Sequence, residues 1–155
     1  MICSLAIANI LSPKSIDKSS LDFWIGKWEV TSERKKDGED VIEKWVAGNA
    51  IVEHWRDVDG HEGKSFFYFL PEKKQWKQVW VTDGEGYKEK LSEPFANGIR
   101  FTGTVFLPDG KTYHDRTTLT KLPNGTVRQV IESSRDGKTW KLRYDANYRQ
   151  LSRGK

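Results

Sequence analysis

Turn signals recur along this chain at close to regular spacing, and they separate short runs of β-branched and aromatic residues. Asp-Gly and Asn-Gly pairs between such runs are typical of β-hairpins, because these residues accept the positive φ angles of tight turns. No stretch of ten or more residues has helical periodicity, and only residues 19–23 suit a helical turn, with Ser19 or Ser20 as its cap. The pattern predicts ten short strands, at 24–31, 41–47, 50–57, 64–70, 75–82, 87–92, 98–106, 111–120, 126–133 and 139–144.

The connections between these strands are short, which favours a meander; one of them, residues 33–40, is expected to be a charged loop. Meandering strands expose the fewest edges when the sheet closes on itself. We therefore expect an all-β fold, a single antiparallel up-and-down β-barrel of about ten strands with room for one small ligand. A two-sheet sandwich is the alternative, but it usually needs longer crossing connections. The expected boundaries are a flexible N-terminal extension at 1–18, the barrel at 19–149 and a basic C-terminal tail at 150–155.

The formal net charge of +4 is unevenly distributed. Residues 135–155 hold seven cations and two anions, so this end carries +5 and the rest of the chain −1. Such a basic end is usually a solvated surface. The chain has no arginine-rich run, zinc-finger spacing or RNA-binding aromatic motif, so we expect no nucleic-acid partner. No run approaches the roughly 20 apolar residues of a membrane span.

The first residues and the single cysteine bear on compartment and cofactors. The apolar run 2–11 has the length of a signal-peptide core, but no positive charge precedes it, so the cytoplasm is favoured. Secretion through an atypical N-terminal signal is the alternative. Cys3 excludes an internal disulfide and a cysteine cluster, and His54, His61 and His114 lie on separate elements, so we expect no metal and no cofactor. The sequence leaves open whether the protein is a monomer or a homodimer.

Alternation along each strand indicates which side chains enter the barrel. Lysine favours water, so the face opposite Lys77 should point inward, and the same reasoning applies to the third and last strands. The fourth strand offers two faces, and the pattern does not choose between them. The predicted inward faces are Ile51-Glu53-Trp55, Trp76-Gln78-Trp80 and Trp140-Leu142-Tyr144, with either Ser65-Phe67-Phe69 or Phe66-Tyr68-Leu70.

Glu53 and Gln78 would then be polar groups inside an aromatic lumen. A buried polar group without a partner costs about 1–3 kcal/mol, so each needs one: the other, Gln129, Arg116 or Arg128, a trapped water, or a ligand. Either these groups form a satisfied network that specifies the barrel, or they orient a mostly apolar guest in a pocket. Burial would also raise the pKa of Glu53 and make it a candidate general acid or base.

Gly26-Lys27-Trp28 lies near the start of the first predicted strand, ahead of the nine others. This opening resembles the lipocalin-like, or calycin, superfamily, in which the tryptophan of a Gly-x-Trp closes the barrel floor. The resemblance implies a late-strand cation packed on Trp28, here Arg143 or Arg149. Segments 78–81, 127–129 and 132–140 are similar to an uncharacterised bacterial family of the DUF1579 type. The haem-binding relatives have a longer Gly-x-Trp-x-Gly-x-Gly opening that is absent here, which disfavours haem.

These observations predict a barrel that binds a small, largely hydrophobic molecule in its lumen. The alternative is a lipocalin-like enzyme, a cofactor-independent cyclase or isomerase acting on a hydrophobic substrate in the same cavity, with Glu53 as the candidate for proton transfer. A third interpretation is a filled lumen, with function on the outer surface or at the basic end. The residues expected to contact the ligand are Glu53, Trp55, Phe67, Gln78, Trp80, Arg116, Gln129, Trp140 and Tyr144.

Overall fold

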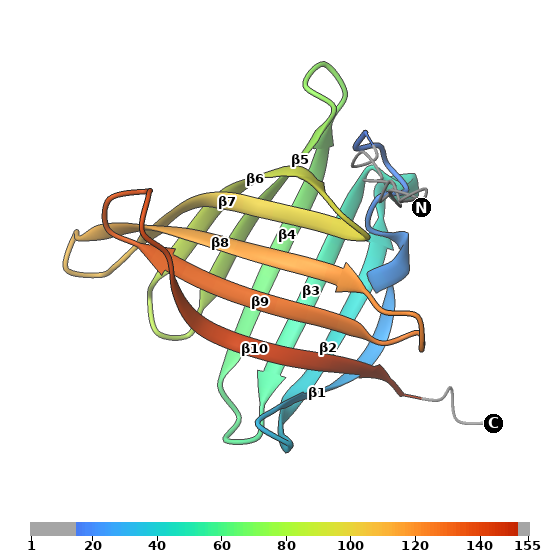
Figure 1. Ribbon diagram of the computed structural model, residues 1–155, viewed down its shortest axis with the longest axis horizontal. Helices are drawn as coiled ribbons and strands as arrows, with labels where there is room; N and C mark the ends of the chain where they lie inside the picture. The colour runs from blue at the N-terminus through green and yellow to red at the C-terminus, as the bar shows by residue number, and fades with distance from the viewer. Residues whose placement is uncertain (1–14, 152–155) are drawn as a thin grey trace, which may run out of the picture.

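Ten antiparallel strands close into a single β-barrel in the computed structural model, which describes residues 15–151. Each strand pairs with its neighbours in sequence, and β1 pairs with β10 to complete the ring (Figure 1). The predicted up-and-down barrel is confirmed, and the N-terminal helical turn is present as the 3-10 turn η1. No helix in the described range is long and apolar enough to cross a membrane. The elements are η1 (Asp22–Trp24), β1 (Gly26–Ser32), β2 (Lys35–Trp45), η2 (Val46–Gly48), β3 (Ala50–Asp57), β4 (Glu62–Leu70), β5 (Gln75–Thr82), β6 (Tyr87–Phe95), β7 (Gly98–Phe106), β8 (Thr112–Lys121), β9 (Val127–Ser134) and β10 (Lys141–Gln150).

Most of the stretch 33–40 belongs to β2, so its prediction as a charged loop was wrong. The chain reverses at Glu33 and Arg34, whose φ angles of 46° and 66° are those of a tight hairpin turn. Beyond the turn, exposed charged residues alternate with buried ones, because one face of β2 meets water and the other faces the lumen. The Asp37-Gly38 pair lies where the register against β1 shifts, so it forms a β-bulge and not a turn.

Apolar side chains fill one end of the barrel, and the segment that leads into β1 covers them. Trp24 lies edge-on to Phe67 at a ring-centroid distance of 5.7 Å. Two indole N–H groups tie the covering segment to the strands: Trp28 Nε1 donates to the Trp24 carbonyl at 2.8 Å, and Trp76 Nε1 donates to the Asp17 carbonyl at 2.9 Å. The buried cluster at this end comprises Ile16, Leu21, Trp24, Trp28, Val30, Ile42, Ile51, Phe67, Trp76, Ile99, Phe101, Leu119, Val127, Ala146 and Tyr148.

The two ends of the chain are described in part. The structure describes the predicted extension at 1–18 only from residue 15, so the apolar run 2–11 lies outside the described residues. Ile16 is buried in the apolar cluster, which makes this part of the extension a cover for the barrel end. At the other terminus Gln150 belongs to β10, and the backbone N–H of Leu151 donates to the Lys27 carbonyl at 2.8 Å.

Tyr148, and not a cation, packs on Trp28, with the two rings edge-on at 6.4 Å. Alternation points Tyr148 inward and Arg149 outward, where its guanidinium donates to Glu29 at 2.6 Å. Arg143 donates to a serine hydroxyl on β9 at 2.6 Å. Both arginines that the resemblance suggested for Trp28 therefore have other partners, and that expectation is corrected.

A bulge in β10 corrects the predicted inward face Trp140-Leu142-Tyr144. The register of β10 against β9 shifts between Leu142 and Tyr144, which breaks the strict alternation on which the prediction relied. Leu142 is 61% exposed as a result, whereas Tyr144 faces the lumen. Trp140 precedes the strand and packs beneath the guanidinium of Arg116, away from the lumen.

Candidate functional site

On β3 and β5, successive inward-facing residues lie in three layers of the barrel. The first residue belongs to the apolar cluster, the second to a layer of polar side chains, and the third lines the cavity. The spacing of two residues follows from strand geometry, since every second side chain points to the same face. The predicted inward faces of β3 and β5 are confirmed, and β4 uses the first of the two faces left open: Ile51-Glu53-Trp55, Trp76-Gln78-Trp80 and Ser65-Phe67-Phe69.

The middle layer of buried polar side chains runs across the barrel and is here called the polar belt. Seven strands contribute one residue each, and none of the seven is more than 8% exposed. Buried polar groups are costly unless they are paired, so this layer is an expensive feature for a domain of this size. The polar belt comprises Asp40, Glu53, Ser65, Gln78, Lys90, Thr117 and Gln129.

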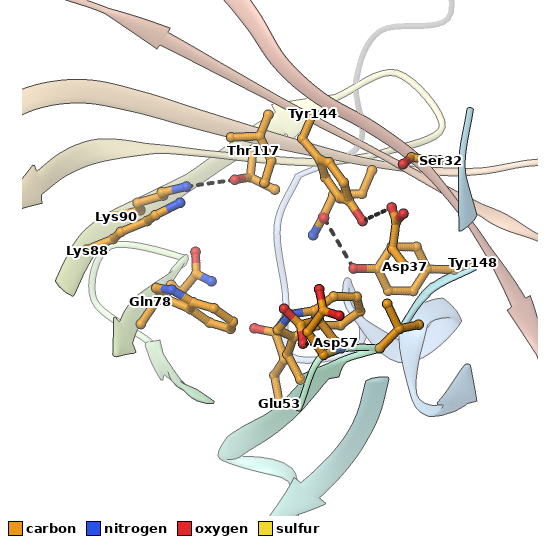
Figure 2. Close-up of a pocket in the computed structure, with 16 residues that line it drawn as sticks. Ser32, Asp37, Glu53, Asp57, Gln78, Lys88, Lys90, Thr117, Tyr144 and Tyr148 are labelled. Carbon is orange, nitrogen blue, oxygen red and sulfur yellow. Dashed lines mark hydrogen bonds between the residues drawn. The ribbon is translucent and has the colours of Figure 1, made fainter. Parts of the chain in front are cut away.

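A cavity of about 450 Å³ lies on the side of the polar belt away from the apolar cluster (Figure 2). It reaches the surface beside the turn between β3 and β4, where Val58 and Asp59 are exposed. Trp55, Trp80 and Ile131 supply apolar walls. The lining comprises Ser32, Asp37, Glu53, Trp55, Asp57, Val58, Asp59, Gln78, Trp80, Lys88, Lys90, Thr117, Gln129, Ile131, Tyr144 and Tyr148.

Two glycines make room for the two tryptophans of the cavity wall. A Cβ atom at Gly63 would overlap the indole of Trp80. A Cβ atom at Gly38 would lie 2.7 Å from Cη2 of Trp55 and would overlap a backbone carbonyl of β3. Contacts this short do not occur, so the absence of a side chain at both positions leaves the space that the two indoles occupy.

Glu53 is held by a chain of hydrogen bonds at the base of the cavity. The Ser65 hydroxyl donates to Glu53 Oε2, and Gln78 Nε2 donates to the Ser65 oxygen at 2.9 Å. Burial raises the pKa of Glu53, while the Ser65 hydrogen bond opposes that rise. Gln78 Oε1 is buried and has no hydrogen-bond partner within residues 15–151, so one end of this amide is free toward the cavity.

Asp40 lies behind Glu53 and is fully buried. Burial, followed by the charge of Glu53, raises the pKa of Asp40 well above its usual value. Neither Asp40 oxygen has a hydrogen-bond partner at normal distance and angle within the described residues, and a hydrogen bond to Glu53 contributes to the rise in the pKa of Asp40. The two carboxyl groups are therefore an interacting pair in which the pKa of Asp40 is raised the more strongly and Glu53 is the member that lines the cavity.

Lys88 and Lys90 form a positively charged side of the cavity, here called the lysine wall. Lys90 donates to Thr117 Oγ1 at 2.6 Å and forms an ion pair with Asp115, while Lys88 Nζ lies 3.8 Å from Asp115. Burial lowers the pKa of Lys90 to about 8; the Lys88 charge lowers it further, and Asp115 opposes both effects. Two cations thus share one buried carboxylate.

Two tyrosines connect the remaining lining residues. The Tyr144 hydroxyl donates to Asp37 Oδ2 at 2.7 Å, which links β10 to the bulge of β2 (Figure 2). The Tyr148 hydroxyl donates to Gln129 Oε1 at 3.2 Å. Burial is the largest cause that raises the pKa of both tyrosines, so both hydroxyls stay protonated and act as donors.

Six of the nine predicted ligand-contacting residues line the cavity: Glu53, Trp55, Gln78, Trp80, Gln129 and Tyr144. The other three lie elsewhere. Phe67 packs beneath the polar belt in the apolar cluster. Arg116 points outward from β8, where it donates to Glu132 at 2.6 and 3.0 Å and stacks on Trp140 at 4.2 Å.

Sequence reasoning missed seven charged residues in or beside the cavity: Asp37, Asp40, Asp57, Asp59, Lys88, Lys90 and Asp115. Asp37 and Asp40 fall in the stretch interpreted as a loop. The two lysines are hidden by the rule that lysine belongs in water. One signal for them exists: the face of 87–92 that carries Lys88, Lys90 and Ser92 alternates with one that carries Tyr87 and Leu91, so neither face of this strand is simply apolar or charged.

Neither a family model nor a curated protein matches this chain. The closed ten-stranded antiparallel barrel is consistent with a calycin-like or lipocalin-like fold. No family match supports the narrower resemblance to the DUF1579 type. Within the part of the chain that the structure describes, no group of three or more His, Cys, Asp or Glu side chains is placed to hold a metal ion.

Proposed function

We propose that this barrel binds a small organic molecule in its lumen, with the apolar part against Trp55, Trp80 and Ile131 and a polar group at the polar belt. The observation that carries the proposal is a cavity of about 450 Å³ whose base presents the free end of the buried Gln78 amide. Pockets for small organic ligands combine apolar walls with a few placed polar groups in this way. The proposal includes a relationship to the calycin superfamily and, within it, to the DUF1579-type family.

The cavity volume weighs against the interpretation in which side chains fill the lumen. A volume of about 450 Å³ falls within the range of roughly 300–1,000 Å³ that is typical of ligand pockets. Glu53, Gln78 and Gln129 would orient the ligand, because each lies in the polar belt and also lines the cavity. Tyr144 would contribute its ring, since its hydroxyl is engaged by Asp37.

The enzyme alternative is favoured by one observation, the Asp40–Glu53 pair at the base of the cavity. A carboxyl group with a raised pKa that faces a ligand is suited to proton transfer, as a cyclase or isomerase requires. Glu53→Gln keeps the shape and a hydrogen-bonding group. We expect this variant to retain ligand affinity within a few-fold if the protein is a carrier, and to lose turnover if Glu53 transfers the proton.

The first test compares native and denaturing mass spectra of the protein purified from its own host. A bound mass that disappears on denaturation is the expected result. Ile131→Trp, which adds an indole inside the cavity, should abolish the bound mass. Val81→Trp adds the same group on the exposed outer face of β5 and is the matched control. A bare wild-type protein, or equal occupancy of the two variants, would contradict binding in the lumen.

A further inference from the structure

We propose that the lumen selects a ligand with one anionic group, a carboxylate or a similar acid, held between Lys88 and Lys90. This inference rests on the proposed function and specifies the ligand class for the same cavity. The two lysines are two residues apart on β6 and both line the cavity, with their ammonium groups directed into it (Figure 2). The site is buried: the side chain of Lys90 is 1% exposed and that of Lys88 is 23% exposed.

The lysine wall has more positive charge than its one ion-pair partner neutralises, and Glu53 interacts with both lysines through its charge without forming an ion pair. Asp115 is the only carboxylate in the described structure that forms an ion pair with either lysine, and it serves both. An ammonium group has three N–H donors, and Lys90 uses two of them, on Thr117 and Asp115. Lys88 makes only the 3.8 Å approach to Asp115. An anion between the two lysines would therefore receive N–H donors and balance one positive charge.

The neighbours of the lysine wall suit an acid with an apolar body. Lys88 is the register partner of Trp80 on β5, so an apolar group attached to the bound anion would lie against this indole. Lys90 is the register partner of Gln78, whose free Oε1 is an acceptor and would take a hydrogen-bond donor on the body of the ligand, not its acidic group. The ammonium donors for the acidic group and the aromatic surface for the rest of the ligand are thus adjacent.

Other carboxylates also face the cavity, but in the described structure none of them forms an ion pair with the lysine wall and most are already engaged. Burial raises the pKa of Glu53, and the charges of Lys88 and Lys90 act to lower it. Figure 2 shows Asp37 and the lysines on opposite sides of the cavity. Asp37 accepts from Tyr144, and Asp57 Oδ1 accepts two backbone N–H groups of the turn after β3, both at 2.9 Å. Glu53 accepts from Ser65, and burial favours the protonated form of Asp40. The nearest charged groups to an anion at the lysine wall are therefore the two ammonium groups.

Three probes of nearly identical shape and different charge test this inference: naphthalene-2-carboxylate, naphthalene-2-carboxamide and naphthalene-2-carboxamidine. Calorimetry at neutral pH gives the affinity of each. A hydrogen-bonded charge in a buried site is worth about a tenfold change or more, so we expect the carboxylate to bind at least about tenfold more tightly than the amide. The cationic amidine should bind most weakly.

Variants assign the preference to the lysine wall. Lys88→Met keeps the apolar stem, and we expect it to reduce carboxylate affinity to that of the amide while amide affinity stays unchanged. Lys64→Met removes an exposed lysine of β4 and should change neither value. Lys90→Met alone would leave the buried Asp115 without its ion-pair partner and could prevent folding. The second variant therefore combines Lys90→Met with Asp115→Leu. Binding of the amide by this double variant shows that the barrel is intact.

The outcomes separate this inference from the proposed function. Equal affinities for all three probes, unchanged by Lys88→Met, would overturn the anion preference while binding in the lumen stands. Tightest binding of the amidine would also overturn it, because the carboxylates of β2 and β3 would then control selection. Failure of the amide as well as the carboxylate to bind would count against both proposals.

Discussion

The two ends of this barrel are built from the same strands but filled in opposite ways. At one end Trp24, Trp28, Phe67 and Trp76 pack to almost zero exposure. At the other end the same strands present charged and amide side chains around a cavity of about 450 Å³. The polar belt separates the two.

The difference shows how one small domain can divide stability from function. Burying apolar surface stabilises by about 25 cal/mol per Å², so the packed end supplies the free energy of folding. Burying the polar belt costs free energy unless every group is paired. The packed end is therefore what allows the cavity end to keep charged groups out of water.

The largest expected contrast comes from one truncation at each end. Phe67→Ala opens a hole in the packed end and should lower the free energy of unfolding by about 3–5 kcal/mol. Trp55→Ala removes a partly buried wall of the cavity and should cost less than half as much, while it weakens ligand binding. Chemical denaturation measures both, and equal losses of stability would break the proposed division between the ends.

Lys90→Met tests whether the charged side of the cavity is also part of the stable core. Removing one partner of a buried ion pair typically costs about 3–5 kcal/mol. We expect about 3 kcal/mol, the low end of that range, because Lys88 also lies near Asp115. The double change to Lys90→Met and Asp115→Leu should recover part of the loss in the same denaturation assay. A single variant as stable as the wild type would refute the burial of this charge.

Asp40→Asn addresses the pH dependence of stability. The folded-state pKa of Asp40 is raised above its ordinary 3.8, so the folded protein holds a proton that the unfolded chain releases. Stability from this group is complete below about pH 4 and declines as pH rises through the folded-state pKa. The asparagine variant should show a shallower decline in thermal melts across that interval. Glu39→Gln, on the outer face of the same strand, is the control and should keep the wild-type slope.

Arg116→Met should have the smallest effect. Its ion pair with Glu132 and its stacking on Trp140 lie on the outer surface, where such contacts are worth about 1 kcal/mol or less. Affinity for any ligand of the lumen should not change, because Arg116 does not line the cavity. A loss of ligand affinity in calorimetry would place this residue back at the site.

The fold was predictable because its signals are local. Turn dipeptides and alternation predicted ten strands and a closed meander, and the inward faces Ile51-Glu53-Trp55 and Trp76-Gln78-Trp80 follow from alternation alone. Two bulges limit this reasoning. The one at Asp37-Gly38 turned a strand into an apparent loop, and the one before Tyr144 reversed the face of Leu142. A bulge depends on pairing with a distant strand, so short-range patterns do not reveal it.

The site was predictable where its residues share a strand face with aromatic or aliphatic side chains, as Glu53 does with Ile51 and Trp55. Trp55, Trp80 and Gln78 were expected in the lumen and line the cavity. Lys90 was not, because its burial depends on Asp115 and Thr117, which belong to β8 and lie 25 or more positions further along the sequence. Partners supplied by another strand decide which charges can be buried.

The glycines at 38 and 63 give the cavity an unusual kind of genetic control. Neither has a side chain of its own in the cavity, yet each leaves the space that an indole of the cavity wall occupies. A change of one methyl group at either position would reshape the cavity without altering any side chain that lines it. If the lumen binds a ligand as proposed, its preference can therefore diverge among descendants of this protein while every lining side chain stays the same.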